Sequence, residues 1–171
     1  PTPEPTQPPT STLPADQQRH RVALIVPMTG ANANVGQSIA NATTMALLDT
    51  NAQNVRITTY DSALGAAAAA SQAILDGNKL ILGPLQGGDI GAVASVARGA
   101  KVPLITYAND AGMAARDVFL LGTVPGNSIG RTVTYAAEKG VRRYAVLAPQ
   151  SDYGQRTSAA YAAAVQQAGS L

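Results

Sequence analysis

The chain has 171 residues, of which 46% are hydrophobic and 13% charged, so it can bury a core the size of one ordinary domain. The formal net charge is only +2, and the basic residues are scattered apart from Arg19/Arg21 and Arg142/Arg143, so a nucleic-acid partner is not expected. The absence of cysteine excludes disulfides, thiolate nucleophiles and thiolate zinc sites.

The first residues are rich in proline and poor in large apolar side chains. Residues 1–18 read PTPEPTQPPTSTLPADQQ, a composition that cannot bury enough surface to offset its ordering entropy. We expect residues 1–19 to be a disordered linker. It either spaces the domain from an anchor or neighbour, or is a tail without a role. No apolar run approaches the roughly 20 residues that span a bilayer.

Short apolar runs then alternate with alanine-rich segments of helical length. The expected strands are Val22–Val26, Val55–Tyr60, Leu80–Leu82, Pro103–Thr106, Val118–Leu121 and Tyr144–Ala148. The expected helices are Gly36–Thr50, Gly65–Asp76, Asp89–Gly99, Asn127–Lys139 and Gly154–Ala168. This alternation predicts an α/β fold with a doubly wound, mostly parallel sheet, for which we take the strand order 2-1-3-4-5.

Periodicity and end signals support the helices. Ile90, Val93 and Ala97 form one buried stripe, and Ile129, Val133 and Ala136 form another. The alanines at 66–70 predict close packing through small side chains. We expect Asp89 to cap a helix beginning at Ile90, and Gly99 and Gly140 to end helices.

In such a sheet, ligands bind outside the carboxyl ends of the strands, where the strand order reverses. The loops after the first and third strands, residues 27–36 and 83–89, meet there, with residues 107–110 next to them. Thr29 and backbone groups would supply a hydrogen-bonding wall. The amides of Gly87 and Gly88 could bind an anion at a helix start, or the glycines only make the turn.

One segment matches an enzyme signature, since residues 126–130 read G-x-S-x-G, the nucleophile elbow of serine hydrolases. The only histidine, His20, lies upstream, and Pro125 interrupts the strand that an elbow needs. Asn127 or Ser128 as an ordinary helix cap explains the match without strain and is the favoured interpretation. Dinucleotide and P-loop motifs are absent, and Asp110, Asp117 and Asp152 are scattered. We therefore expect no metal, cofactor or catalytic residue. A serine hydrolase built on Ser128 ranks third, below two non-catalytic binding functions.

Four segments carry a family resemblance: VALIVPMTG at 22–30 followed by Gly36, ILGP at 81–84, VPLIT at 102–106 and SDYG at 151–154. In their order and spacing they resemble the type I periplasmic-binding-protein superfamily, in its leucine/isoleucine/valine-binding branch. Three longer segments, at 73–85, 105–110 and 119–149, are most similar to the penicillin-binding protein activator family.

The resemblance implies two α/β lobes with a ligand cleft between them. Residues 20–122 would form the first lobe, and 123–171 the hinge crossing and part of the second, so we expect a fragment. Tyr153 matches the cleft tyrosine of the second lobe, or packs before Gly154. The residues expected in the cleft are Met28, Thr29, Gly30, Gln86, Gly87, Gly88, Tyr107, Asn109, Asp110, Asp152 and Tyr153.

Two loops depart from the amino-acid-binding members, which hold the ligand with serine and threonine hydroxyls after the third and fourth strands. Here those positions read Gln86-Gly87-Gly88 and Ala108-Asn109-Asp110. This favours a non-catalytic extracytoplasmic regulator of peptidoglycan synthesis. It would bind a bifunctional penicillin-binding protein, or a small polar ligand in its cleft, in the periplasm, with an outer-membrane lipid anchor as one form of attachment. The alternative is a solute-binding protein of an ABC transporter for amino acids or similar ligands.

Overall fold

The computed structural model describes residues 18–169, so the expected linker at 1–19 lies almost wholly outside the described residues. The chain divides into two compact units. The first comprises Pro1–Ala108 and Met113–Leu120, and the second comprises Asn109–Gly112 and Leu121–Leu171. The expected lobe boundary between residues 122 and 123 stays a prediction.

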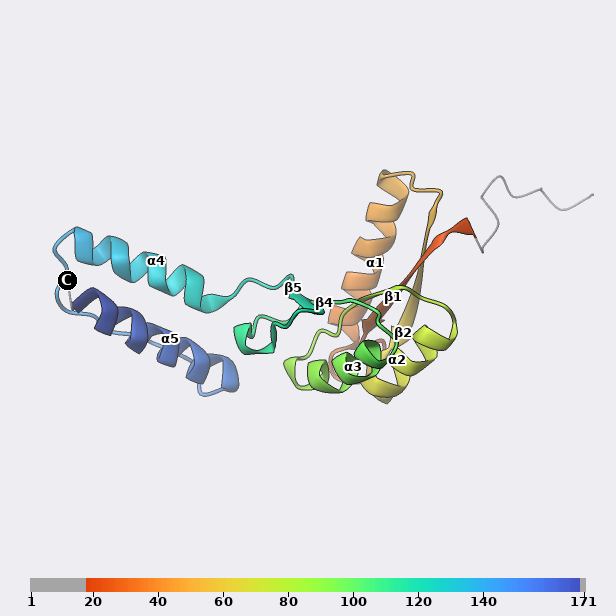
Figure 1. Cartoon of the computed structure of the whole chain (residues 1–171). Coiled ribbons are helices and arrows are strands. Elements are labelled where there is room, and N and C mark those ends of the chain that lie inside the picture. The colour runs from red at the N-terminus through yellow and green to blue at the C-terminus, as the bar shows by residue number, and fades with distance from the viewer. Residues whose placement is uncertain (1–17, 170–171) are drawn as a thin grey trace, which may run out of the picture. The chain divides into compact units, whose positions relative to one another are not determined.

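The first unit contains a five-stranded parallel sheet (Figure 1). Its strands are β1 (His20–Val26), β2 (Val55–Asp61), β3 (Leu80–Leu82), β4 (Leu104–Thr106) and β5 (Val118–Leu120). Its helices are α1 (Ala33–Asp49), α2 (Ala66–Leu75) and α3 (Gly87–Gly99), and two short 3-10 turns are η2 (Ser62–Leu64) and η3 (Ala111–Met113). The strand order β2-β1-β3-β4-β5 confirms the doubly wound α/β prediction.

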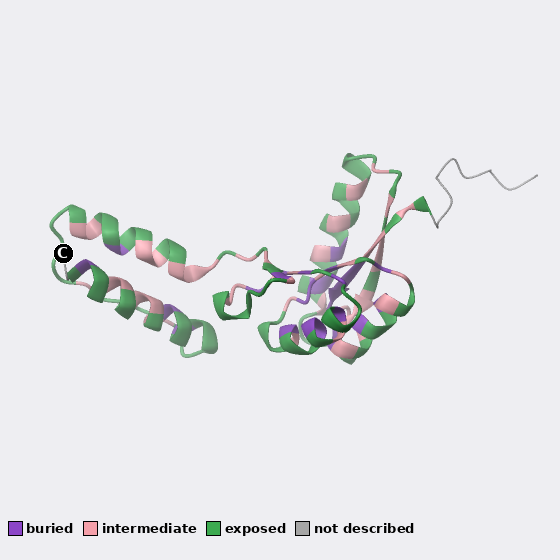
Figure 2. Cartoon of the chain, in the orientation of Figure 1, coloured by how far each residue is buried: buried purple, intermediate pink, exposed green. Residues whose placement is uncertain are grey.

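Both faces of the sheet are covered by helices, with α1 on one face and α2 and α3 on the other (Figure 1). Alternate residues of β1 divide between two cores, because side chains of a strand point to opposite faces. Ala23 and Ile25 pack with α2 and α3, whereas Leu24 and Val26 pack with Ala40 of α1. Buried residues concentrate on the strands and on the helix sides that face them (Figure 2).

The predicted stripe of α3 is confirmed, whereas on α4 (Pro125–Glu138) only Val133 of the predicted stripe is buried and Ile129 and Ala136 are half-buried. Ile90, Val93 and Ala97 are buried on α3, and three alanines of α2, at positions 66, 70 and 73, pack against the sheet through their small side chains. One end signal is wrong, because α3 begins at Gly87 with Gln86 in the N-cap position. Asp89 therefore lies inside the first turn and does not cap the helix.

The second unit contains α4 (Pro125–Glu138) and α5 (Asp152–Gly169), which pack against each other. The predicted strand at Tyr144–Ala148 is wrong, since residues 141–149 form neither strand nor helix. A strand needs a hydrogen-bonded neighbour, and the described part of this unit contains no other strand. None of the helices between residues 18 and 169 has both the length and the apolar character to span a membrane.

Candidate functional site

A hollow of about 430 Å³ lies at the carboxyl ends of β1, β2 and β3 in the first unit. The loop after β1 supplies one wall, η2 and the start of α2 supply another, and the start of α3 completes it. The polar side chains that line it are Thr29, Asn32, Ser62, Gln86 and Asp89. This is the edge at which doubly wound sheets bind their ligands.

Asp61, the last residue of β2, holds the loop after β1 in place. Its carboxylate accepts a hydrogen bond from the Met28 amide at 2.8 Å, from the Thr29 hydroxyl at 2.6 Å and from the Ala63 amide at 2.9 Å. The Thr29 hydrogen bond is the main cause that lowers the pKa of Asp61 below its usual value. One charged group thus connects two walls of the hollow, and the Thr29 hydroxyl is already donated to it.

Two glycines allow backbone segments to meet beneath the hollow. A Cβ at Gly36 in α1 would overlap the carbonyl oxygen of Pro27, and one at Gly83 would overlap that of Ile25. Gly83 also has a φ of +112°, a region that side chains disfavour. The first turns of α1 and the loop after β3 therefore lie directly against the end of β1.

The start of α3 brings both positive and negative electrostatic character to the hollow. The free amide groups of a helix N-terminus favour an anion. Asp89 sits in that same turn and lines the hollow. Its carboxylate disfavours a second anion there, so the wall suits neutral or cationic polar groups better than a carboxylate.

Three of the seven site residues predicted in the first unit line this hollow, namely Thr29, Gly30 and Gln86. Met28 and Tyr107 instead pack against the core beneath α1, and burial raises the pKa of Tyr107. Gly87 and Gly88 are exposed in the first turn of α3 without lining the hollow.

The other four predicted site residues belong to the second unit. Asn109 and Asp110 line a smaller hollow of about 180 Å³ together with Arg156 of α5, whose guanidinium lies 3.8 Å from the Asp110 carboxylate. Asp152 and Tyr153 are exposed in the first turn of α5 and do not line it. That all eleven residues share one cleft stays a prediction.

The start of α5 repeats a contact seen in the first unit. A Cβ at Gly154 would overlap the carbonyl oxygen of Pro149, as one at Gly36 would overlap that of Pro27. Eight residues separate proline and glycine in the first unit, and four separate them in the second. Each unit therefore seats the beginning of a helix against a proline carbonyl through a glycine.

The serine signature does not form a nucleophile elbow. Residues 126–130 lie in the first turns of α4, with Val124 in the N-cap position and Pro125 as the first helical residue. Asn127 and Ser128 are thus helical residues, and the prediction that one of them caps the helix is wrong. An elbow requires a sharp turn between a strand and a helix, which this segment lacks.

Asp61, Ser62 and Asp89 are site residues that the sequence patterns do not single out as ligand contacts. The strand order carries the missing signal, because β2 is the other neighbour of β1 and ends at the same edge. An acidic residue at the end of the second strand is therefore placed beside the start of the loop after the first.

Comparisons with known proteins find one curated sequence relative and solved structures that share the fold. A curated relative, an uncharacterized protein of Rickettsia prowazekii, is 26% identical over 145 residues, which cover 84% of this chain and 39% of that protein. The LpoA structure from Haemophilus influenzae is 22% identical with a TM-score of 0.72, covering 90% of this chain and 28% of that one. The structure of a putative branched-chain amino acid ABC transporter from Rhodospirillum rubrum is 22% identical with a TM-score of 0.75. The match covers 88% of this chain and 47% of that one.

The chain spans less than half the length of each of these relatives. The sequence model of the periplasmic binding protein family matches residues 20–170, which include both units from β1 onward. With its parallel sheet and its polar hollow at the carboxyl edge, the chain belongs to the periplasmic binding protein family.

Proposed function

We propose that this chain is part of a non-catalytic, periplasmic regulatory protein that binds and activates a bifunctional penicillin-binding protein. Membership of a binding-protein family supports a binding role. The C-domain of LpoA from Haemophilus influenzae, described as a regulator of PBP1A, is 21% identical to the chain and has a TM-score of 0.70. That likeness concerns the fold, so the regulatory role rests on the site.

The observation that carries the proposal is the position of Asp89. A receptor for free amino acids must hold an α-carboxylate, and a helix N-terminus is a favourable place for it. Here the first turn of α3 already contains a carboxylate that lines the hollow, and Thr29 donates its hydroxyl to Asp61. These groups disfavour capture of a free amino acid and leave the edge as a surface for a protein partner.

The test is a binding measurement with the full-length protein and a purified bifunctional penicillin-binding protein. Saturable binding together with faster glycan polymerisation or cross-linking is expected. A monofunctional penicillin-binding protein serves as the matched control. Binding without any change in either rate, or equal binding to the control, would contradict the regulatory role.

A lipid anchor on the outer membrane is part of the same proposal. The whole protein from membranes should then carry an acylated N-terminal cysteine, which mass spectrometry detects. Release of the unmodified protein with the soluble periplasmic fraction would contradict the anchor without affecting the binding experiment.

The second candidate function is solute binding, favoured by a polar hollow of about 430 Å³ at the ligand edge. Several solute-binding proteins share the fold, including one from Rhodopseudomonas palustris in complex with 3,4-dihydroxy benzoic acid, with a TM-score of 0.70 and 22% identity. A ligand that binds the native state raises its melting temperature. Thermal-shift screening of the full-length protein against amino acids and aromatic acids therefore separates the two functions.

Asp89→Ser sharpens this screen. Removing the charge from the first turn of α3 should strengthen binding of a carboxylate there by about two- to five-fold, the usual size of a charge effect at a helix end. Asp49→Ser, at the last residue of α1, removes an exposed charge from the same unit and is the control. Strong binding of amino acids by the unmodified protein would favour the solute-binding function instead.

A further inference from the structure

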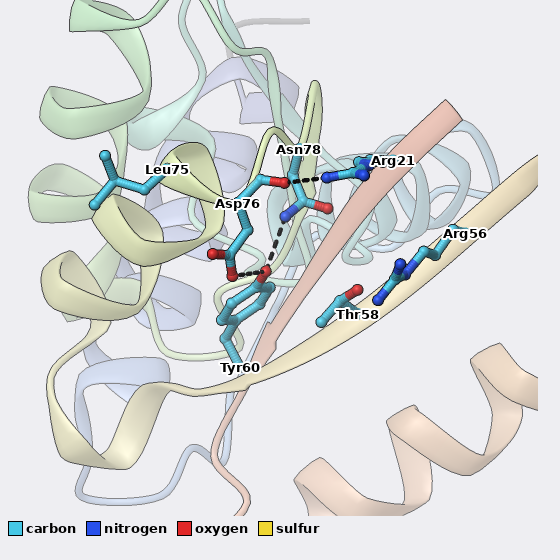
Figure 3. Close-up of a pocket in the computed structure, with 7 residues that line it drawn as sticks. All are labelled: Arg21, Arg56, Thr58, Tyr60, Leu75, Asp76 and Asn78. Carbon is cyan, nitrogen blue, oxygen red and sulfur yellow. Dashed lines mark hydrogen bonds between the residues drawn. The ribbon is translucent and has the colours of Figure 1, made fainter. Parts of the chain in front are cut away.

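The hollow at the carboxyl edge differs from the hollow over β1 and β2 in what its polar side chains contact. In the hollow over β1 and β2, drawn in Figure 3, polar groups bind one another. The Tyr60 hydroxyl donates to Asp76 at 2.7 Å, and the Asn78 amide donates to Tyr60 at 2.9 Å. Arg21 donates to the backbone carbonyl of Asp76 at 2.6 Å. This network is structural, because each of these groups already has a partner within the fold.

At the carboxyl edge, three polar side chains that line the hollow lack such partners. The Ser62 hydroxyl, the Gln86 amide and the Asp89 carboxylate form no hydrogen bond or ion pair with the side chains or backbone of the described residues. Ser62 begins η2, whereas Gln86 and Asp89 belong to the N-cap and the first turn of α3. Two walls of the hollow therefore present polar groups that the fold itself does not use.

Ser62 is the most deeply placed of the three residues. It is 8% exposed, but its oxygen is not among the described polar atoms that are closed off from solvent without a partner. The hydroxyl is therefore accessible from the hollow that the residue lines. Buried hydroxyl groups usually have a hydrogen-bond partner, so an unpaired one at the wall of a hollow indicates a group that binds there.

The charge of the hollow favours a cation. Asp89 is the charged residue among those that line it, and none of the lining residues is Lys, Arg or His. Asp61 directly precedes Ser62 and places a second carboxylate behind the same wall. A cation in the hollow is thus attracted by two carboxylates and repelled by no lining residue. This negative site lies on a chain whose formal net charge is +2.

The arrangement of acceptors suits an ammonium group better than a guanidinium group. An ammonium group has three donors that point in different directions, whereas the donors of a guanidinium group lie in one plane. The hollow offers a carboxylate and an amide oxygen from α3 and a hydroxyl oxygen from η2. Three oxygens from two walls can surround an ammonium group.

The rest of the lining suits a hydrocarbon chain attached to that ammonium group. Small apolar residues line it, namely Pro27, Ala31, Ala63 and Ala66. Lysine side chains bury their methylene groups against such surfaces while the charged end binds polar groups. A hollow of about 430 Å³ has room for a lysine side chain and part of the backbone that carries it.

From these observations we propose that the hollow at the carboxyl edge binds the ammonium group of a lysine side chain. The inference rests on the function proposed above, since the lysine belongs to the bifunctional penicillin-binding protein that the chain activates. Asp89 forms an ion pair with the ammonium group, and the oxygens of Ser62 and Gln86 accept its other hydrogen bonds. The small apolar residues cover its methylene groups.

The first experiment tests the ammonium site without the partner. Nα-acetyl-lysine N-methylamide is compared with the norleucine compound, which lacks only the ammonium group. Each is titrated at constant ionic strength into the ¹⁵N-labelled chain at pH 7. The lysine compound is expected to shift the backbone amides of residues 29–32, 62–66 and 86–89 with saturation, and the norleucine compound is not. Saturable shifts with both compounds, or with neither, would overturn the ammonium site.

Variants of the lining residues test each contact. Asp89→Asn removes the charge at nearly constant size and should weaken binding of the lysine compound about ten-fold, while Asp89→Glu restores most of the affinity. Ser62→Ala should weaken binding about three-fold, the usual effect of one neutral hydrogen bond. Asp49→Asn removes an exposed charge at the end of α1 and should leave the affinity unchanged. Unchanged affinity in Asp89→Asn would overturn the ion pair.

The second experiment adds the partner to the full-length protein. Asp89→Asn should weaken binding of the bifunctional penicillin-binding protein about ten-fold, and Asp49→Asn should not. If the partner binds the unmodified protein and Asp89→Asn equally well, the partner's lysine is not the occupant, and the proposed function still stands. If the partner does not bind the unmodified protein, the proposed function fails together with this occupant, whereas the titration with the lysine compound still decides the ammonium site.

Discussion

Asp61 shows how a single side chain organises the candidate site. Its carboxylate accepts three hydrogen bonds that connect the loop after β1 with η2. Hydrogen bonds to the charged form of a carboxyl group stabilise that form and lower its pKa. The native state consequently prefers Asp61 ionised more strongly than the unfolded chain does, and this couples the loop to pH.

The coupling predicts acid sensitivity. Because the folded pKa of Asp61 is lowered, the stability it contributes is fully present above the unfolded pKa of about 3.9 and is lost as pH falls below it through the folded pKa. Urea midpoints measured between pH 2.5 and 6 should therefore fall less steeply with acid in Asp61→Asn than in the unmodified chain. Asp49→Asn is the control, because Asp49 accepts none of these three hydrogen bonds. Parallel curves for Asp61→Asn and the unmodified chain would contradict the prediction.

At the scale of elements, the contact between α1 and the end of β1 depends on Gly36. Gly36 and Gly91 are both interior helical glycines, but only Gly36 has a backbone oxygen where a Cβ would lie. Gly36→Ala should destabilise the chain by about 1–3 kcal/mol through overpacking. Gly91→Ala, with nothing within 4 Å, should stabilise it by about 0.5–1 kcal/mol. Urea unfolding measures both, and equal effects would refute the steric argument.

Elements with local signals could be predicted from the sequence, and elements that depend on partners could not. The stripe of Ile90, Val93 and Ala97 identifies α3, because helical periodicity is a property of the segment itself. Residues 144–148 have a strand composition, but a strand also requires a neighbour. The sequence predicts too late a start for α3, because Asp89 is a good capping residue that here lies within the first turn.

The site was predictable to the extent that topology determines it. Strand order brings the loops at Thr29 and Gln86 to one edge, and both residues line the hollow. Met28 and Tyr107 belong to the same loops, but their apolar surfaces are buried in the core. Which side chain of a loop faces the ligand depends on packing, and this is not visible in the order of the residues.

For the molecule as a whole, the buried hydrophobic residues are distributed unequally between the two units. The first unit buries Ile25, Ile81, Leu104 and their neighbours between its helices and its sheet. In the second unit the buried hydrophobic residues are Val133 and Ala168, within a pair of helices. A pair of helices with so small a core is marginally stable on its own.

Hydrogen exchange of the 171-residue chain should therefore show two levels of protection. Amides of β1, β3 and β4 are expected to exchange slowest, through global unfolding, while those of α4 and α5 exchange through local opening. Mass spectrometry of peptic peptides measures the difference. Equal protection of α5 and β1 would indicate a single cooperative unit and contradict the prediction.

The paired contacts of Pro27 with Gly36 and of Pro149 with Gly154 have a consequence for variation among related proteins. Each helix is anchored at its start whatever the residues between proline and glycine are, and the two intervening segments already differ in length. Because the contact uses a backbone carbonyl oxygen, it requires the glycine and not the side chain opposite it, so the intervening segments can change in length and sequence while the glycine is kept.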